Sequence, residues 1–240
     1  MSEAVFVEGL TKAYDGKTVV DHLNLSVKRG TVFGLLGANG AGKSTTIECM
    51  LGTKQADGGT IRLLGQDPKE KHRALFQRIG VQFQEGDYQK EIRVAELCDE
   101  TASLYSHPAD WRVLCQQFGI GDKLRAPVRS LSGGERQRLF IVLALIPQPE
   151  LVFLDELTTG LDARARRGVW KTLEGLKEQG LTIFLTSHFM DEVEALCDEI
   201  CILKKGASVF RGTVAQAKRQ CGCERFEDAY LQLSDEEAGA

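Results

Sequence analysis

The sequence lacks the surplus of positive charge that is typical of proteins that bind nucleic acid. Its 240 residues include 34 acidic and 30 basic side chains, which give a formal net charge of -4 at pH 7. A protein that binds a phosphate backbone needs lysine and arginine concentrated on one face or stripe. Nucleic acid is therefore not an expected partner of this chain.

Long hydrophobic runs are also missing. No uninterrupted apolar stretch approaches the roughly 20 residues that a membrane-spanning helix needs. The opening residues, MSEAVFVEG, do not combine a basic segment with an apolar one, as an export signal does. We therefore expect the chain to stay in the cytosol.

The cysteines do not form a recognisable framework. There are seven, an odd number, scattered along the chain, and in a cytosolic protein such cysteines are expected to be reduced thiols. Cys221 and Cys223 could bind a metal as a pair. No histidine or further cysteine cluster nearby completes a set of four ligands, so ordinary loop cysteines are favoured there.

With 42% hydrophobic residues, the chain is long enough for one core with a smaller lobe attached. Short β-branched runs broken by glycine turns between residues 5 and 32 predict antiparallel strands. Apolar runs separated by helical patterns predict parallel strands with helical crossovers. The predicted buried strands are 31–36, 151–154 and 181–186. Helical spacing covers 43–51, 94–117, 132–145 and 163–179, and Pro108 and Pro127 mark breaks between helices. The fold class is therefore α/β.

A glycine-rich loop joins the first buried strand to a helix. It fits the phosphate-loop pattern in full, with Gly37, Ala38, Asn39, Gly40, Ala41, Gly42, Lys43 and Ser44. Backbone N–H groups and a helix N-terminus attract phosphate oxygens, the Lys43 ammonium reaches the β and γ phosphates, and the Ser44 hydroxyl can coordinate Mg²⁺. A glycine-rich turn that binds nothing would require all these features to coincide by chance.

Two carboxylates follow the apolar strand 151–154, at the end where open α/β sheets bind ligands. Consecutive strand residues point to opposite faces, so Asp155 and Glu156 can have different roles. We expect Asp155 to hold Mg²⁺ and Glu156 to polarise an attacking water. A strand that ends in Asp-Glu often only meets solvent, and it is the phosphate loop upstream that favours a catalytic role.

The segment Ser132-Gly133-Gly134-Glu135 has the spacing of a helix capping box. A cap alone needs only one or two special residues. The two glycines also let a backbone approach a phosphate closely.

Leu-Ser-Gly-Gly-Glu-Arg-Gln, residues 131–137, resembles the signature of ABC-type ATPases, and the other motifs of that family follow in order. Tyr14 resembles the aromatic that stacks on adenine, Gln84 the glutamine that links nucleotide to the membrane partner, and His188 the switch histidine. Gly160-Leu161-Asp162 resembles the dimer-contact loop. The resemblance covers residues 5–213. Simpler alternatives are core packing for Tyr14, a solvated strand end for Gln84, and helix capping or surface exposure for His188.

The resemblance implies a single ABC ATPase domain over residues 1–240, with a P-loop NTPase core, an antiparallel β subdomain and a helical subdomain. The core with its β lobe would span about 1–84 and 150–215, the helical lobe about 85–149, and a C-terminal tail about 216–240.

The family's site residues carry over by position, with ATP and Mg²⁺ as the implied ligands. The implied catalytic residues are Glu156, His188 and Lys43. The implied nucleotide-binding residues are Tyr14, Gly37, Ala38, Asn39, Gly40, Ala41, Gly42, Lys43, Ser44, Thr45 and Gln84. The implied metal ligands are Ser44, Gln84 and Asp155. The residues implied to act across a dimer are Ser132, Gly133, Gly134 and Glu135, with Asp162 in the dimer contact.

The implied partners are a second ATPase subunit, identical or paired, and a multi-helix membrane permease that docks near residues 85–130. The chain would then lie on the cytoplasmic face of the membrane. Segments 189–194 and 226–231 are most similar to ATPases of drug, lipid or polysaccharide exporters. The alternative is a soluble ABC ATPase acting on the ribosome or another assembly, although such proteins usually have two tandem domains. A metabolic kinase would not explain Leu-Ser-Gly-Gly or His188.

Two positions depart from the family pattern. Leu157 stands where proline usually follows the glutamate, which removes a rigid backbone restraint. Leu143 lies in the signature helix where an Ala-Arg pair is usual, so apolar bulk replaces a charge. Neither residue is a nucleotide ligand, and we expect activity to survive.

Overall fold

The computed structural model describes residues 3–70, 72–82, 89 and 91–234. Its strands are β1 (Glu3–Tyr14), β2 (Lys17–Lys28), β3 (Val32–Leu36), β4 (Gly58–Leu63), β5 (Ile79–Gln82), β6 (Leu151–Leu154), β7 (Thr182–Thr186), β8 (Glu199–Lys204) and β9 (Ala207–Gly212). Its α-helices are α1 (Lys43–Met50), α2 (His72–Leu75), α3 (Val94–Ser103), α4 (Trp111–Gln117), α5 (Gly133–Leu145), α6 (Ala163–Glu178), α7 (Met190–Leu196), α8 (Val214–Cys221) and α9 (Phe226–Ser234). Short 3₁₀ turns occur at Gly121–Lys123 and Val128–Ser130.

Two sheets form the body of the protein. The larger has the strand order β5-β6-β7-β3-β8-β9, and its pairs are parallel except for the β8–β9 hairpin. Strands β3, β6 and β7 are buried along their whole length, as expected for parallel strands with helices on both faces. The smaller sheet, β2-β1-β4, is antiparallel. The predicted α/β fold with an antiparallel β subdomain is confirmed.

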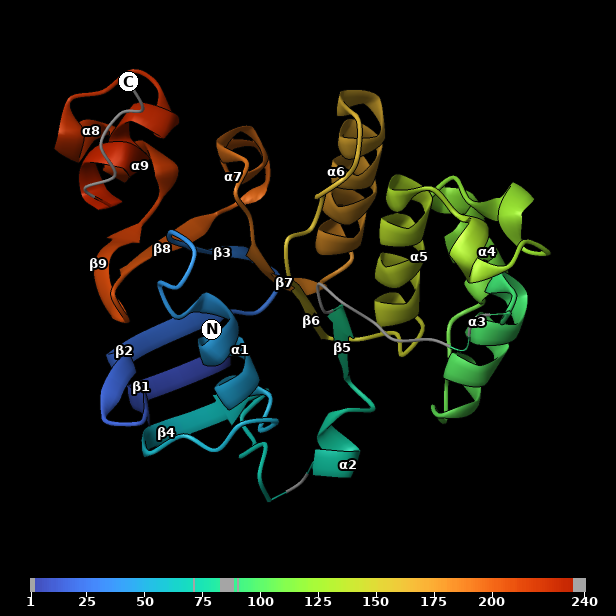
Figure 1. The fold of residues 1–240 in the computed structure, drawn as a ribbon, viewed down its shortest axis with the longest axis horizontal. Helices are drawn as coiled ribbons and strands as arrows, with labels where there is room; N and C mark the ends of the chain where they lie inside the picture. Colours follow the sequence, from blue (N-terminus) through green and yellow to red (C-terminus); the bar gives the residue numbers. More distant parts are fainter. Residues whose placement is uncertain (1–2, 71, 83–88, 90, 235–240) are drawn as a thin grey trace.

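The predicted strand-loop-helix unit is confirmed at β3 and α1 (Figure 1). Gly42 occupies the N-cap position of α1 with φ 103°. A Cβ atom there would lie 2.5 Å from the Val19 carbonyl oxygen. The loop therefore needs glycine at this position both for its left-handed backbone and for its close approach to β2.

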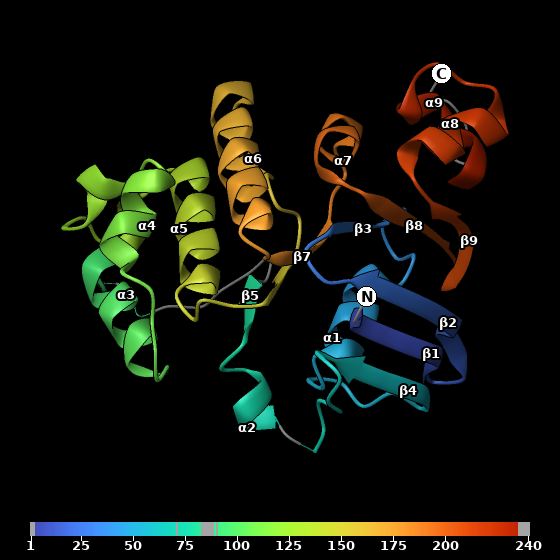
Figure 2. The ribbon, with the colours of Figure 1, turned by 180° about the vertical axis from the view of Figure 1, so that it is seen from behind.

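Helices α3, α4 and α5 gather at one end of the larger sheet, beside β5 and β6 (Figures 1 and 2). They share an apolar core that includes Trp111, Phe118 and Phe140. Helix α5 packs on β5 so closely that a Cβ atom at Gly80 would lie 1.9 Å from the Ala144 carbonyl oxygen. Glycine is what allows the helical group to approach the sheet. The lobe boundaries at 84/85 and 149/150 stay a prediction.

The chain from 214 to 234 folds into two helices, α8 and α9, against the β8–β9 hairpin. Phe226 and Tyr230 are buried in this small cluster with Ile202. The resemblance to the family predicts only a C-terminal tail over about 216–240. Cys221 and Cys223 lie where α8 ends, and all seven cysteines are free thiols. Within the described ranges, no helix has the length and apolarity to cross a membrane.

Candidate functional site

The glycine-rich loop wraps around the Lys43 ammonium. Its Nζ donates to the carbonyl oxygens of Gly37 at 2.6 Å and of Ala38 at 3.1 Å, and the side chain is largely buried. Residues 38–40 and Ser44 are exposed on the rim of the loop, and Thr45 is half-buried. Lysine, helix N-terminus and backbone N–H groups therefore concentrate positive potential where the loop meets solvent, which suits an anionic phosphate chain.

Asp155 follows β6 as predicted and is 9% exposed. Its Oδ1 accepts a hydrogen bond of 2.5 Å from the Thr186 hydroxyl at the end of β7. Burial raises the pKa of Asp155, the neighbouring Glu156 raises it further, and the charges of Lys43 and His188 oppose the rise. These electrostatic effects join the phosphate loop, the two carboxylates and the histidine into one site.

Glu156 has a left-handed backbone conformation, with φ 52°, which is uncommon for a residue other than glycine and costs about 1–3 kcal/mol. Hydrogen bonds on each side hold it. The Glu156 N–H donates to the Thr186 hydroxyl at 2.9 Å. The Gln137 side-chain amide donates to the carbonyl oxygens of Glu156 at 3.1 Å and Leu157 at 2.9 Å. Helix α5, through Gln137, therefore holds the backbone of Glu156 in place.

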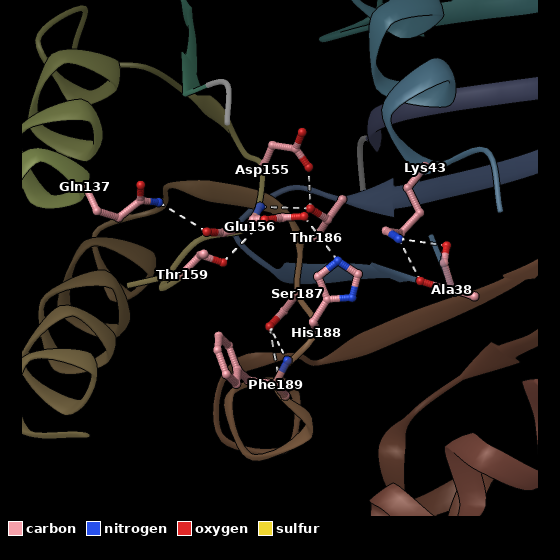
Figure 3. Close-up of polar contacts among 11 residues, drawn as sticks. Ala38, Lys43, Gln137, Asp155, Glu156, Thr159, Thr186, Ser187, His188 and Phe189 are labelled. Carbon is pink, nitrogen blue, oxygen red and sulfur yellow. Dashed lines mark hydrogen bonds and ion pairs between the residues drawn. The ribbon is translucent and has the colours of Figure 1, made fainter. Parts of the chain in front are cut away.

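Figure 3 shows two contacts of the Glu156 carboxylate. One is His188, whose Nε2 lies 3.1 Å from Oε1, and the other is the Thr159 hydroxyl, 3.4 Å from Oε2. His188 does not cap α7, because Phe189 holds the N-cap position. The capping alternative is therefore wrong, and the ring instead turns toward the carboxylate.

The predicted capping box at Ser132 and Glu135 is confirmed, and α5 begins at Gly133. The Ser132 N–H and the Lys123 ammonium hold the pKa of Glu135 at about 2. Ser132 and Gly133 are exposed. A Cβ atom at Gly134 would lie 3.1 Å from Leu161 and 3.3 Å from the Gly160 carbonyl, so the signature and the 160–162 loop lie together in one chain.

Asp162 is the N-cap of α6, and its Oδ1 accepts from the Ala165 N–H at 2.8 Å. Tyr14 ends β1 and is 39% exposed, and the Lys12 and Lys54 ammonium groups lie 5.1 and 5.6 Å from its ring centroid. The core-packing alternative for Tyr14 is therefore wrong. Gln84 lies outside the described residues.

The signature and the phosphate loop do not meet within one chain. In both ribbon views, α5 stands on the other side of β6 and β7 from α1 (Figures 1 and 2). Among the described residues, no hydrogen bond, ion pair or ring contact links Ser132, Gly133 or Gly134 with the 37–45 loop.

The two departures from the family pattern are packing positions. Leu157 is fully buried among the apolar residues of the helical group, and Leu143 is partly buried against the same cluster. Each side chain therefore adds apolar contact. Two hydrogen bonds from Gln137 restrain the backbone at Glu156 and Leu157.

The residues predicted to bind Mg²⁺ supply suitable donors. Ser44 presents an exposed hydroxyl, and Asp155 a carboxylate whose pKa is raised by burial and lowered by nearby cations. Mg²⁺ prefers hard oxygen ligands and keeps several of its waters. A cation beside Asp155 would offset the cost of its buried charge, so the described part of the donor set fits the ion.

Sequence analysis missed Gln137 and Thr186 as parts of this site. Gln137 belongs to the signature segment 131–137, but nothing in a linear pattern shows that its amide reaches residues 156 and 157. A usable signal is its place on the buried face of α5, where a polar side chain needs partners. Thr186, at the end of a fully buried strand, gives a similar signal.

The comparisons with known proteins agree on one family. The ABC transporter family model matches residues 20–159. A Nod factor export ATP-binding protein I of Ralstonia nicotianae is 41% identical, over 92% of this chain and 71% of that protein. The daunorubicin/doxorubicin resistance ATP-binding protein DrrA of Streptomyces peucetius is 36% identical, over 100% of this chain and 73% of that protein. A solved ATP-binding subunit of an ABC transporter superposes with a TM-score of 0.88 at 26% identity, over 96% of this chain and 99% of that one.

Proposed function

The chain belongs to the ABC transporter family as an ATP-binding ATPase of the exporter type, and we propose that it works as a dimer that drives export through a separate membrane permease. The observation that carries the proposal is the paired arrangement of Glu156 and His188 at the edge of the sheet, across from the loop that surrounds Lys43 (Figure 3). This arrangement supports cleavage of the terminal phosphate of ATP.

In the proposed reaction, water attacks the γ-phosphorus of ATP, the bond to the β–γ bridging oxygen breaks, and ADP and phosphate leave. Glu156 accepts a hydrogen bond, and then the proton, from that water. His188 holds the Glu156 carboxylate through its 3.1 Å contact. Lys43 and the N-terminus of α1 stabilise negative charge on the phosphate oxygens. Tyr14 stacks on the adenine, and residues 37–45 bind the phosphates. Mg²⁺, held by Ser44, Gln84 and Asp155, would neutralise phosphate charge.

A dimer is supported by the separation of the two phosphate-binding surfaces. The phosphate loop lies at α1 and the exposed Ser132–Gly133 segment at α5, apart from each other in one chain (Figure 1). A second subunit packed head to tail brings the signature of one chain, residues 132–135, to the ATP bound by the other. The positive end of α5 then faces the γ-phosphate. Asp162 lies in the contact between the subunits.

A membrane partner is supported by the names of the relatives and by the surface of the helical group. The two relatives described above are named for Nod factor export and for drug resistance. Leu104 and Val113, exposed by 67% and 47%, are two of the four large apolar side chains exposed in the described structure. Both fall within residues 85–130. We propose that this part of the chain docks on the cytoplasmic face of a permease. These relatives favour export over the soluble ribosome-acting alternative.

The test uses the purified full chain with ATP and Mg²⁺. Glu156→Gln should lower the hydrolysis rate by about 10² to 10⁴, as expected for loss of a general base, and should accumulate as a dimer in ATP by light scattering. Glu178→Gln changes an exposed acid at the end of α6 and should behave as wild type. A monomeric Glu156→Gln protein in saturating ATP would exclude the dimer mechanism, and wild-type turnover would place the base elsewhere.

A further inference from the structure

Glu192 is a buried carboxylate that the reaction described above does not use. It lies on α7, four residues after His188, and is fully buried. Its Oε1 accepts hydrogen bonds from the Thr158 hydroxyl at 2.6 Å and the Trp170 indole N–H at 3.0 Å. A buried carboxyl group is costly unless it is partnered, and Oε2 of Glu192 is buried with no hydrogen-bond partner among the described residues. The side chain therefore depends on the two donors to Oε1.

The two donors come from segments that also belong to the site. Thr158 lies between Glu156 and the 160–162 loop, and Trp170 is on α6, the helix that Asp162 caps. Glu192 therefore joins three segments: the turn after the catalytic glutamate, the helix after the dimer-contact loop, and the helix after the switch histidine. Both donors meet the same oxygen of one buried side chain, so the three segments are expected to move together.

A second contact between α6 and α7 runs beside the first. The Arg166 guanidinium lies 4.5 Å from the centroid of the Phe189 ring and donates to the Asp191 carboxylate at 3.3 Å. Phe189 directly follows His188. Helix α6 thus contacts the segment 188–192 at two places. Arg166 contacts Phe189 and Asp191 at the surface, and Trp170 contacts Glu192 in the interior.

We infer that Glu192 is a positioning residue that transmits the engagement of the 158–162 loop by a second subunit to His188, and so sets the His188–Glu156 contact. The inference rests on the proposed function, because it requires a partner subunit at Asp162. Glu192 does not touch ATP in this account. It acts through His188, so its effect should exist only while His188 is present.

The first experiment removes one hydrogen bond with a matched control. Trp170→Phe deletes the indole N–H that reaches Glu192, and Trp111→Phe deletes an equivalent one, which donates to Asp99 at 2.9 Å within the helical group. We expect Trp170→Phe to lower kcat about tenfold, as for loss of one buried hydrogen bond. Its KM for ATP and ATP-dependent dimerisation should be unchanged. Trp111→Phe should keep wild-type kcat. Equal kcat in the two variants would overturn the inference.

The second experiment is a double-mutant cycle by single-turnover hydrolysis of radiolabelled ATP. Glu192→Gln should lower the hydrolysis rate of the otherwise wild-type chain. In a chain that also carries His188→Ala, it should leave the rate unchanged. If Glu192→Gln does not fold, Thr158→Val takes its place in the same cycle. If Glu192→Gln lowered the hydrolysis rate by the same factor with and without His188, Glu192 would act independently of His188. That result would overturn this inference but not the proposed function. A wild-type chain that neither hydrolyses ATP nor dimerises would instead overturn the proposed function.

Discussion

Gln137 is expected to link the stability of the protein to its catalytic rate, because its amide holds the turn at Glu156. In Gln137→Leu both donated hydrogen bonds are lost. The Glu156 carbonyl keeps the Thr159 N–H at 3.2 Å, but the buried Leu157 carbonyl is left unpaired. One unpaired buried carbonyl costs about 1–3 kcal/mol. We therefore expect the unfolding free energy to fall by about 2 kcal/mol, which lowers Tm by about 4–8 °C in a protein of this size.

The same substitution should affect catalysis. Without Gln137, the left-handed conformation of Glu156 loses one of its supports, and the carboxylate can turn away from His188. A misplacement of about 1 Å can cost 10²-fold in rate, so we expect kcat to fall about 10- to 100-fold with little change in KM for ATP.

The assay pairs urea unfolding with steady-state hydrolysis, and Gln77→Leu is the matched control. Gln77 also bonds two backbone groups, Leu104 O at 3.0 Å and Ser106 N at 2.9 Å, but between α2 and the end of α3. That variant should lose stability and keep its kcat. If Gln137→Leu lost stability at unchanged kcat, the turn at Glu156 would not depend on α5, and the reasoning would be refuted.

Further predictions concern packing, base recognition and acid stability. Gly80→Ala places a methyl group against the Ala144 carbonyl and should destabilise by about 3 kcal/mol or more in thermal unfolding, whereas Gly168→Ala, in open space on α6, should be neutral or stabilising. Tyr14→Ala should raise KM for ATP about tenfold or more through loss of stacking, and Tyr14→Phe should not, as measured by initial rates. The pKa of Glu135 is lowered from 4.5 to about 2, so its stabilisation is full above pH 4.5 and is lost as the pH falls toward 2. Glu135→Gln should cost about 1 kcal/mol at pH 7, reduced by solvent screening, and the difference from wild type should shrink below pH 4.5 in urea titrations.

The elements that surround the candidate site could be predicted because each has a local cause. The loop before Lys43 combines glycines with a following helix, the capping box at Ser132 starts α5, and the run before Asp155 is a fully apolar strand. Phosphate loop, carboxylates and signature could therefore be identified without coordinates. The α/β fold followed from the same apolar runs and is confirmed.

What could not be predicted depends on contacts between distant segments. From the sequence, Glu192 is predicted to be an acid in the first turn of a helix, where acidic side chains are normally solvated. Only the fold brings Thr158 and Trp170 to it and buries it. Helices α8 and α9 were missed for a related reason: their small apolar faces become a core only against β8 and β9.

The most direct test of the account is to tag the chain carrying Glu156→Gln, extract membranes in mild detergent with ATP present, and identify what co-purifies. We expect a multi-helix membrane protein at equal stoichiometry with the chain. We also expect that the association is lost when Leu104 and Val113 are both changed to aspartate, while ATP-dependent dimerisation is kept. Ribosomes in place of a membrane protein, or no membrane protein at all, would contradict the proposed function and leave a soluble ABC ATPase.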